Sequence, residues 1–324
     1  MESQRRVLIT GGAGFIGSHL ADSFLRDGQS VFVLDDLSTG TLRNIHHLLD
    51  HPHFKLEVGS VMDEALCDRV VKDCNEVIHL AAAVGVKMIF ERPMATILCN
   101  VHGTENILHS ALQCGRKVFI ASTSEVYGKQ HPENSQGFRE EDDVTLGTSM
   151  RWAYACSKAL DEYLGRSYWI SKGLPVVIGR LFNTVGPRQS GDYGMVIPRF
   201  VQWALQNKPI QVYGDGQQVR SFTHVYDAVQ AIRCLMAAPG VEGQIVNIGG
   251  PGTISMLALA QKVKNMTRSS SEIVSMPYEQ AFGEGFDDIR NRRPDISKLQ
   301  QLTSFKPKYS LDEILEDTIR SFQR

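Results

Sequence analysis

Tyr154 and Lys158 stand four residues apart in a segment, residues 153–171, whose apolar pattern predicts a helix. At this spacing the two side chains project from the same helix face. A nearby ammonium group stabilises a phenolate relative to a phenol. Lowering the pKa of a phenol from about 10 to near 7 takes roughly 4 kcal/mol of such stabilisation. The pair therefore has the chemistry of a base that removes a proton from a hydroxyl group.

The spacing alone is weak evidence, because Tyr168 and Lys172 repeat it further along the same segment. Position favours the first pair. Tyr154 lies near the start of the helix, and it follows a hydroxyl-rich stretch, residues 121–128, that leaves a predicted strand. Thr123 in this stretch is the second candidate catalytic residue.

A glycine-rich turn lies between the apolar run of residues 7–9 and a predicted helix over residues 15–25. Gly11 permits a tight turn, Gly14 lets backbone N–H groups approach phosphates, and Gly17 lets the helix pack closely on the strand. The positive N-terminus of the helix then faces the anion. This strand, turn and helix predict a site for the pyrophosphate of a dinucleotide.

Asp35 ends a second apolar run, residues 30–34, at the distance expected for a ribose contact in such a unit. Its carboxylate can accept both ribose hydroxyls, whereas a 2′-phosphate would meet like charge. Asp36 follows, with no Lys or Arg beside it. We therefore expect NAD rather than NADP.

Apolar β-rich runs alternate with amphipathic segments over the first 181 residues. This alternation predicts an α/β protein with a doubly wound parallel sheet, a Rossmann fold. Further strands are expected at residues 54–58, 76–80, 118–121 and 175–181, and helices at 62–72, 95–113 and 153–171. The polar stretch 129–149 has no periodicity and is expected to be an active-site flap.

The pattern changes after residue 180. Helices are expected at residues 196–206 and 225–236, a strand at 244–248 that returns to the main sheet, and two more helices in the tail 254–324. The resulting hypothesis is an NAD-binding domain over residues 1–182, joined by a returning segment at about 220–250. Residues 183–324 would form a smaller C-terminal α+β lobe for the substrate.

Composition excludes several classes of function. The net charge of −2 argues against a nucleic-acid surface, and no run is apolar and long enough to span a membrane. The N-terminal residues enter a strand at once, so no signal peptide is expected. Six cysteines without a close pair indicate reduced thiols and a cytoplasmic protein. His46, His47, His51 and His53 have no ordered ligand spacing, so no metal is expected.

An ordered series of motifs resembles the extended short-chain dehydrogenase/reductases that act on nucleotide sugars. The resemblance covers almost the whole chain. Its motifs are residues 10–17, Asp35, residues 79–82, Asn100 with Gly103 and Thr104, residues 122–128, Tyr154 with Lys158, and residues 180–188, 212–216, 220–225 and 292–296. One departure is Ser60, which stands where many relatives have an aspartate against the adenine ring, so the adenine contacts are left open.

The resemblance implies roles for individual residues. Thr123 would bond the sugar O4, Tyr154 would be the base, and Lys158 would hold Tyr154 and the nicotinamide ribose. The implied cofactor-binding residues are Gly11, Gly14, Phe15, Ile16, Gly17, Asp35, Asp36, Leu80, Ala81, Ala82, Ser122, Tyr154 and Lys158. The implied substrate-binding residues are Ser124, Asn183, Arg188, Tyr213, Arg220 and Arg292, with Arg293 as an alternative to Arg292.

Family members oxidise the sugar at C4 and then diverge. Glu125, after Thr123 and Ser124, makes a triplet that looks like that of UDP-glucuronate decarboxylases and GDP-mannose 4,6-dehydratases. Residues 151–156 and 287–294 are similar to bacterial decarboxylases, in which an arginine at the position of Arg292 addresses the uronate carboxylate. The expected activity is UDP-glucuronate decarboxylation, with Thr123, Glu125, Tyr154 and Lys158 as catalytic residues. The alternatives are 4-epimerisation of UDP-glucose or UDP-glucuronate and 4,6-dehydration, and Glu125 could instead bond backbone N–H groups.

Two further expectations concern class and assembly. A non-catalytic NAD-sensing protein would be expected to lack Tyr154, Lys158 or the diphosphate arginine, and this chain has all three. In the family, helices like those expected at 95–113 and 153–171 pair across a two-fold axis, which predicts a homodimer. The alternative is that their apolar faces only pack on the sheet.

Overall fold

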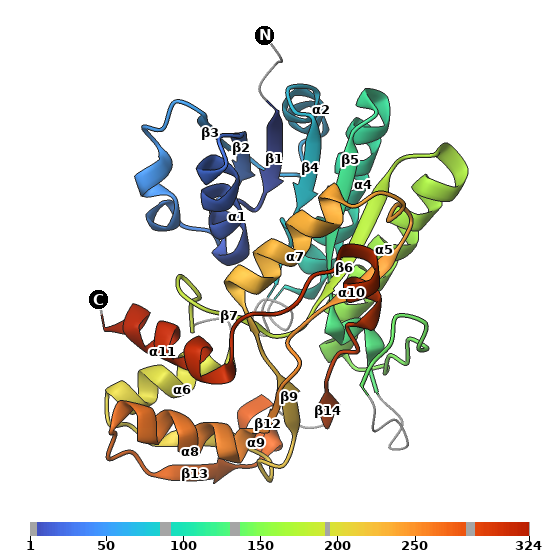
Figure 1. Cartoon of the computed structure of the whole chain (residues 1–324). Helices are drawn as coiled ribbons and strands as arrows, with labels where there is room; N and C mark the ends of the chain where they lie inside the picture. Colours follow the sequence, from blue (N-terminus) through green and yellow to red (C-terminus); the bar gives the residue numbers. More distant parts are fainter. Residues whose placement is uncertain (1–4, 85–91, 130–136, 192–194, 283–288, 324) are drawn as a thin grey trace.

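A seven-stranded parallel sheet forms the centre of the molecule (Figure 1). The computed structural model describes residues 5–84, 92–129, 137–191, 195–282 and 289–323. Strand order is β11-β6-β5-β4-β1-β2-β3, and every pairing in this sheet is parallel. The strands are β1 (Arg6–Thr10), β2 (Ser30–Asp35), β3 (Phe54–Val58), β4 (Glu76–His79), β5 (Lys117–Thr123), β6 (Val176–Leu181) and β11 (Ile245–Ile248).

Helices cover both faces of the sheet, because alternate strand residues point to opposite sides. Val7 and Ile9 of β1 pack toward α1 (Phe15–Arg26) and α7 (Val225–Ala237), whereas Leu8 packs in the core of the other face. That other face carries α2 (Glu64–Lys72), α4 (Pro93–Cys114) and α5 (Ala153–Lys172). The predicted doubly wound sheet is therefore confirmed.

The chain returns to this sheet after leaving it. β11 pairs in parallel with the edge strand β6, which confirms the predicted returning strand. A late helix, α10 (Ser297–Thr303), packs on α7 and β11. The chain thus crosses between the two parts several times, and the proposed boundary at residue 182 stays a prediction.

A second, smaller core lies below the sheet in Figure 1. It is built from α6 (Val196–Leu205), α8 (Met256–Thr267) and α11 (Leu311–Phe322), whose buried faces meet through Val201, Leu259 and Leu315. A two-stranded parallel sheet lies beside them. Its strands are β8 (Ile210–Tyr213) and β13 (Ile273–Met276). This mixture is the expected α+β lobe.

Short strands connect the two parts. β9 (Val219–Ser221) pairs with both β12 (Thr253–Ser255) and β14 (Asn291–Arg292), and β7 (Thr184–Val185) pairs with β10 (Thr223–His224). None of these strands was predicted. Strands of two or three residues are too short to show a period, and their partners lie far away in sequence.

The prediction of two helices in the tail is wrong. Beyond residue 254 the chain forms α8, α9 (Tyr278–Phe282), α10 and α11. α9 and α10 have five and seven residues, about two turns or fewer, so their sequences show no clear amphipathic pattern. Asp287 and Asp288, which belong to a motif used above, lie outside the described residues.

The expected flap over residues 129–149 is anchored rather than open in the part that the structure describes. Phe138 is buried against Tyr127, with ring centroids 4.4 Å apart, and it bridges to Pro294. The backbone N–H of Lys129 donates to Thr145. No described residue of this stretch lines the cavity described below, and residues 130–136 lie outside the description. Within the described ranges, no helix combines the length and apolar composition that crossing a membrane requires.

Candidate active site

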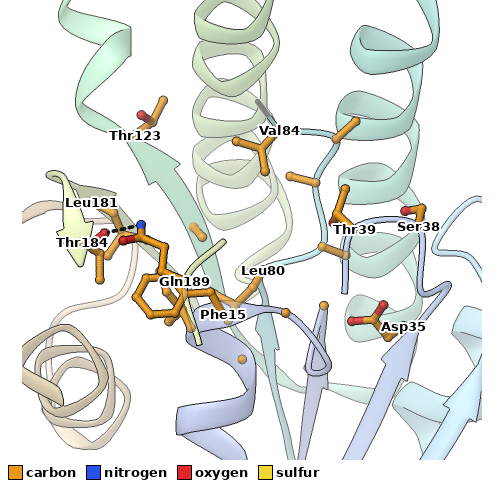
Figure 2. Close-up of a pocket in the computed structure, with 18 of the residues that line it drawn as sticks. Phe15, Asp35, Ser38, Thr39, Leu80, Val84, Thr123, Leu181, Thr184 and Gln189 are labelled. Atoms are coloured by element: carbon orange, nitrogen blue, oxygen red, sulfur yellow. Dashed lines mark hydrogen bonds between the residues drawn. The ribbon is translucent and has the colours of Figure 1, made fainter. Parts of the chain in front are cut away.

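A cavity of about 440 Å³ opens at the carboxyl ends of the central strands, where strand order reverses between β1 and β4. Figure 2 shows Phe15 and Leu80 on its floor, Asp35 with Thr39 and Ser38 toward one end, and Thr123 toward the other. Of the predicted site residues, those that line the cavity are Gly11, Gly14, Phe15, Ile16, Gly17, Asp35, Asp36, Leu80, Ala81, Ala82, Ser122, Thr123, Ser124, Glu125, Tyr154, Asn183, Arg188 and Arg292.

The glycine turn has the geometry that a pyrophosphate site needs. Gly11 has a φ of +70°, and a Cβ there would lie 2.9 Å from the backbone nitrogen of Ala81. A Cβ on Gly17 would collide with the carbonyl oxygen of Gly11. Both positions therefore require glycine. The first residues of α1, whose N–H groups have no partners within the helix, line the cavity.

Asp35 lies toward the end of the cavity away from Thr123 (Figure 2), and two backbone N–H groups hold its carboxylate. Its Oδ2 accepts from the N–H of Ala13 at 2.9 Å, and its Oδ1 accepts from the N–H of Leu37 at 2.8 Å. Burial raises the pKa of Asp35, while these two hydrogen bonds favour the carboxylate. Asp35 and Asp36 together fit the hydroxyls of an adenosine ribose and disfavour a 2′-phosphate, so the residues present fit NAD.

The wall beside the expected adenine position is apolar. Val61 and Cys99 line the cavity there, with Gly59 between strand β3 and the wall. Ser60 turns back on its own loop, where its Oγ accepts from the N–H of Met62 at 3.2 Å. Ser60 is not among the described residues that line the cavity, so it does not take the place of the aspartate of many relatives.

Thr123 ends β5, and Tyr154 lies in the first turn of α5, so two separate elements bring them to the same cavity. The Oγ1 of Thr123 accepts from the N–H of Glu125 at 3.2 Å, which leaves its proton to donate. Burial raises the pKa of the Tyr154 phenol, and the charges of Glu125 and Asp161 raise it further.

Lys158 does not line the cavity. Its Nζ donates to Asp161 Oδ2 at 2.7 Å in an ion pair that is almost fully buried. The role of Lys158 in the ionisation of Tyr154 stays a prediction, and the structure adds that Asp161, to which the lysine is bound, offsets the lysine charge. Asp161 was missed in the sequence, although its i, i+3 spacing from Lys158 could have indicated the pair.

Glu125 is held by two arginines. Its Oε2 accepts from Arg151 Nη1 at 2.9 Å, and its Oε1 lies 3.4 Å from Arg292 Nη1. Burial opposes ionisation of Glu125, but Arg151, Arg292 and the more distant Arg220 outweigh it and lower its pKa to about 2. The carboxylate contacts these side chains rather than backbone N–H groups at the strand end. Arg151 was not assigned a role from sequence. Its position three residues before Tyr154, a spacing that brings side chains together in a helical turn, could have indicated that it lies near the site.

The remaining substrate candidates fall into two groups. Ser124, Asn183 and Arg188 line the cavity; Asn183 Nδ2 donates to the carbonyl of Ser221 at 2.7 Å, and Arg188 Nη2 donates to Asp22 at 2.7 Å. Tyr213 and Arg220 are not part of its described lining and belong to the second lobe. Arg199 donates to the Tyr213 hydroxyl at 3.0 Å, and its guanidinium also lies over the Tyr213 ring.

Backbone contacts on both sides of β14 position Arg292. On one side, β14 pairs with β9, with Arg292 opposite Arg220 in the strand register, and the backbone N–H of Val219 donates to the carbonyl of Arg290 at 2.8 Å. On the other side, the N–H of Phe138 donates to the carbonyl of Arg293 at 2.8 Å. This explains why Arg292 rather than Arg293 reaches the cavity.

The cavity thus joins a dinucleotide site to a phenol, a hydroxyl, a carboxylate and a guanidinium. This set suits proton removal from a sugar hydroxyl next to an anionic group. Among the described residues, no cluster of three His, Cys, Asp or Glu side chains has the arrangement of a metal site.

Comparison with known proteins gives consistent matches over nearly the full chain. The family model for GDP-mannose 4,6 dehydratase matches residues 8–318. A UDP-N-acetyl-alpha-D-glucosaminuronate decarboxylase of Bacillus cytotoxicus is 42% identical over 99% of this chain and 98% of its own length. UDP-glucuronic acid decarboxylase 1 of Arabidopsis thaliana is 36% identical over 98% of this chain and 70% of its own length.

Solved structures with similar folds include ligand complexes. A UDP-glucuronic acid 4-epimerase from Bacillus cereus, in complex with UDP-glucuronic acid and NAD, superposes with a TM-score of 0.88 at 26% identity, over 98% of this chain and 99% of that one. A dTDP-glucose 4,6-dehydratase from Bacillus anthracis in complex with NAD gives 0.87 at 26% identity, over 98% and 96%.

Proposed function

Because this chain belongs to the GDP-mannose 4,6-dehydratase family of NAD-dependent nucleotide-sugar enzymes, we propose that it is a decarboxylase of a UDP-hexuronate. One observation supports this choice above the others. Glu125 and Arg292 line the same cavity as Thr123 and Tyr154, so a guanidinium lies beside the groups that would hold the sugar. A carboxylate on the sugar is recognised well by arginine.

The chain's own residues supply the proton chemistry. NAD⁺, which the glycine turn and Asp35 would hold, would supply hydride transfer at C4 of the sugar. Tyr154 would accept the proton of the C4 hydroxyl while Thr123 donates a hydrogen bond to the same oxygen. The product is a β-keto acid, so the C5–C6 bond can break, CO₂ can leave, and its electron pair can move onto the C4 oxygen. Tyr154 and Thr123 would stabilise that oxyanion, and C5 then takes up one proton from water.

The state of Glu125 weakens the case for dehydration. Expulsion of a C6 hydroxyl needs a proton donor, and a carboxyl group with a pKa of about 2 is ionised at neutral pH. Ser124 supplies no second carboxyl group, which distinguishes the site from that of dTDP-glucose dehydratases but not from that of GDP-mannose 4,6-dehydratases. A simple 4-epimerase needs no guanidinium near C6, so Arg292 would have no role in it. 4-Epimerisation is therefore the second candidate.

Two uronates are candidates, and they differ at C2. The relative named for UDP-N-acetylglucosaminuronate is 42% identical, whereas the UDP-glucuronic acid decarboxylases are 33–36% identical. This difference favours the N-acetylated substrate over UDP-glucuronate.

The test is to incubate the protein and NAD⁺ separately with each uronate and with UDP-glucose, and to weigh the products. Loss of CO₂ from a uronate, with no change in UDP-glucose, is the expected result. An unchanged mass with a new retention time would indicate epimerisation, and loss of water would indicate dehydration. Either outcome would overturn the proposal.

We also propose a homodimer built on α4 and α5. These neighbouring helices carry large apolar side chains at the surface, among them Met94 at 72% exposure, Tyr163 at 64% and Ile170 at 73%. Such exposure on adjacent helices is typical of an interface. Light scattering that finds a monomer at working concentrations would contradict it. The cytoplasmic location stays a prediction from the six cysteines.

A further inference from the structure

Glu125 and Arg292 meet inside the cavity, at the place where the carboxylate of the sugar would bind. Both residues line the cavity, and Glu125 Oε1 lies 3.4 Å from Arg292 Nη1. A guanidinium binds a glutamate carboxylate and a substrate carboxylate through the same N–H donors. Glu125 is therefore a competitor, built into the chain, for the group that the proposed function assigns to the sugar.

Arg151 holds the other oxygen of this carboxylate more closely. Its Nη1 donates to Glu125 Oε2 at 2.9 Å, a length typical of a charge-assisted hydrogen bond, whereas the contact of Glu125 with Arg292 is longer. Arg151 is not among the described residues that line the cavity. It therefore contacts the cavity wall from behind, through Glu125.

The surroundings of Arg151 fix its guanidinium in place. Arg151 lies in a short 3₁₀ helix, Met150–Trp152, directly before α5, and only 10% of its side chain is exposed. The guanidinium lies over the ring of Trp152, 4.5 Å from the ring centroid. Trp152 is buried in a cluster that also contains Phe182. The donor that holds Glu125 is thus packed against the core.

We propose that Arg151 is a positioning residue that makes the site selective for an anionic sugar. By holding Glu125 Oε2, it keeps the Glu125 carboxylate from closing on Arg292, whose guanidinium then binds the carboxylate of the sugar. The inference rests on the proposed function, in which Arg292 makes that contact.

Glu125 should remain ionised when Arg151 is replaced. The charges of Arg292 and Arg220 also lower its pKa, and both arginines stay in such a variant. The released carboxylate would then turn toward Arg292. It would also repel the carboxylate of the sugar, because like charges repel strongly at short distance in a site shielded from water.

The effect should depend on the group at C6 of the sugar. UDP-glucuronate and UDP-glucose differ only there, since the first has a carboxylate where the second has a hydroxymethyl group. UDP-N-acetylglucosaminuronate and UDP-N-acetylglucosamine form a second pair of this kind. A hydroxymethyl group neither competes with Glu125 for a guanidinium nor is repelled by it. Loss of Arg151 should therefore weaken the binding of the uronates and spare the neutral sugars.

The test is the Kd of each of these nucleotide sugars, measured by calorimetry on protein loaded with NADH, which cannot accept a hydride and so prevents turnover. Arg151→Met keeps much of the length of the side chain and removes its charge. It should weaken both uronates about tenfold or more and change both neutral sugars less than about twofold. Arg151→Lys, which restores a cation beside Glu125, should recover part of the uronate affinity.

A double-mutant cycle shows whether Arg151 works through Glu125. Glu125→Gln removes the competing charge. In that background, Arg151→Met should change the Kd of the uronates less than about twofold. Glu125→Gln alone should bind the uronates at least as tightly as wild type does.

Lys117→Met is the matched control. Lys117 begins β5, the strand that ends at Thr123 beside the cavity, and its Nζ lies 2.9 Å from Glu242 in a half-buried ion pair. This variant also takes the cation from a partly buried carboxylate, but at the end of the strand away from the cavity. It should leave the Kd of every sugar unchanged, and a selective loss of the uronates here would overturn the proposal.

Other results would overturn the proposal directly. Unchanged uronate affinity in Arg151→Met, or equal losses for uronates and neutral sugars, would leave Arg151 with no part in selectivity. A uronate loss that persists in the Glu125→Gln background would show that Arg151 does not act through Glu125.

Glu125→Gln alone keeps the question open to test even if Arg151→Met does not fold. A loss of uronate affinity relative to the neutral sugars in this variant would show that Glu125 is no competitor, and it would overturn the proposal. No sugar turns over in these titrations, so a failure to release CO₂ from either uronate would overturn the proposed function alone.

Discussion

The two ends of the cavity differ in the kind of groups that line them. The cofactor end is made largely of backbone groups from one short stretch, the turn between β1 and α1. The sugar end is made of side chains, Thr123, Glu125, Tyr154 and Arg292, that come from three separate parts of the chain. A backbone site depends on the shape of one turn, whereas a side-chain site depends on the packing of the whole molecule. The two ends should therefore fail in different ways.

Tyr154→Phe should have the largest effect, because it should abolish most of the turnover at the sugar end and leave cofactor binding at the other end unchanged. The phenylalanine cannot accept the sugar proton, so kcat should fall about 10³-fold while the Kd for NAD⁺ stays within about twofold. Turnover assays and calorimetry measure the two quantities. Tyr168→Phe is the matched control, because Tyr168 has the same spacing to a lysine, and it should keep wild-type turnover. Equal losses in both variants would contradict the assignment.

Arg292→Met should damage the sugar end for uronates in particular. Loss of a charge-assisted hydrogen bond to the carboxylate should lower kcat/KM about 10- to 100-fold, with NAD⁺ affinity unchanged. Arg290→Met serves as the control, since Arg290 is exposed and pairs with Asp215 at 2.7 Å. If Arg290→Met loses as much as Arg292→Met, the effect is not specific to the site.

Low pH should lower the free energy of unfolding by protonating Glu125. Its folded pKa of about 2 lies below the ordinary value of a glutamate, so its contribution to stability is complete above about pH 5 and is lost as the pH falls toward 2. The loss should be roughly 2 kcal/mol, because the side chain is partly exposed. Urea unfolding at several pH values measures it. Glu125→Gln should show a flatter dependence over this range, and an equally steep one would refute the assignment.

Gly17→Ala tests the cofactor end. The added Cβ must displace the carbonyl of Gly11, so NAD⁺ affinity should fall about tenfold and stability by about 1–3 kcal/mol. Gly252→Ala is the matched control, because a Cβ there meets open space. Wild-type NAD⁺ affinity in Gly17→Ala would show that the turn tolerates a side chain.

Sequence predicted the cofactor end better because its signals are local. The glycine spacing, the apolar runs of β1 and β2, and Asp35 all lie within 30 residues, so a single supersecondary unit carries them. Strand β11 was also predicted, because a buried parallel strand reads as a short apolar run.

The charges of the sugar end were predicted less well. Glu125 and Arg292 were identified as candidates by resemblance, but their contact with each other, and with Arg151, depends on strands of two or three residues that have no periodic signal. The balance between Lys158 and Asp161 depends on burial by α4 and β4, which a helical spacing does not reveal.

The two attachments of β14 have a mechanical consequence. This strand is bonded to β9, which pairs with β12 beside the smaller core, and also to Phe138, which packs with Tyr127 near the main sheet. Rotation of the lobes against each other would pull this short strand in two directions and shift the Arg292 guanidinium with it. If Arg292 binds the carboxylate of the sugar as proposed, this contact depends on the angle between the lobes, so a distant change that alters the angle would alter substrate choice without touching the cavity.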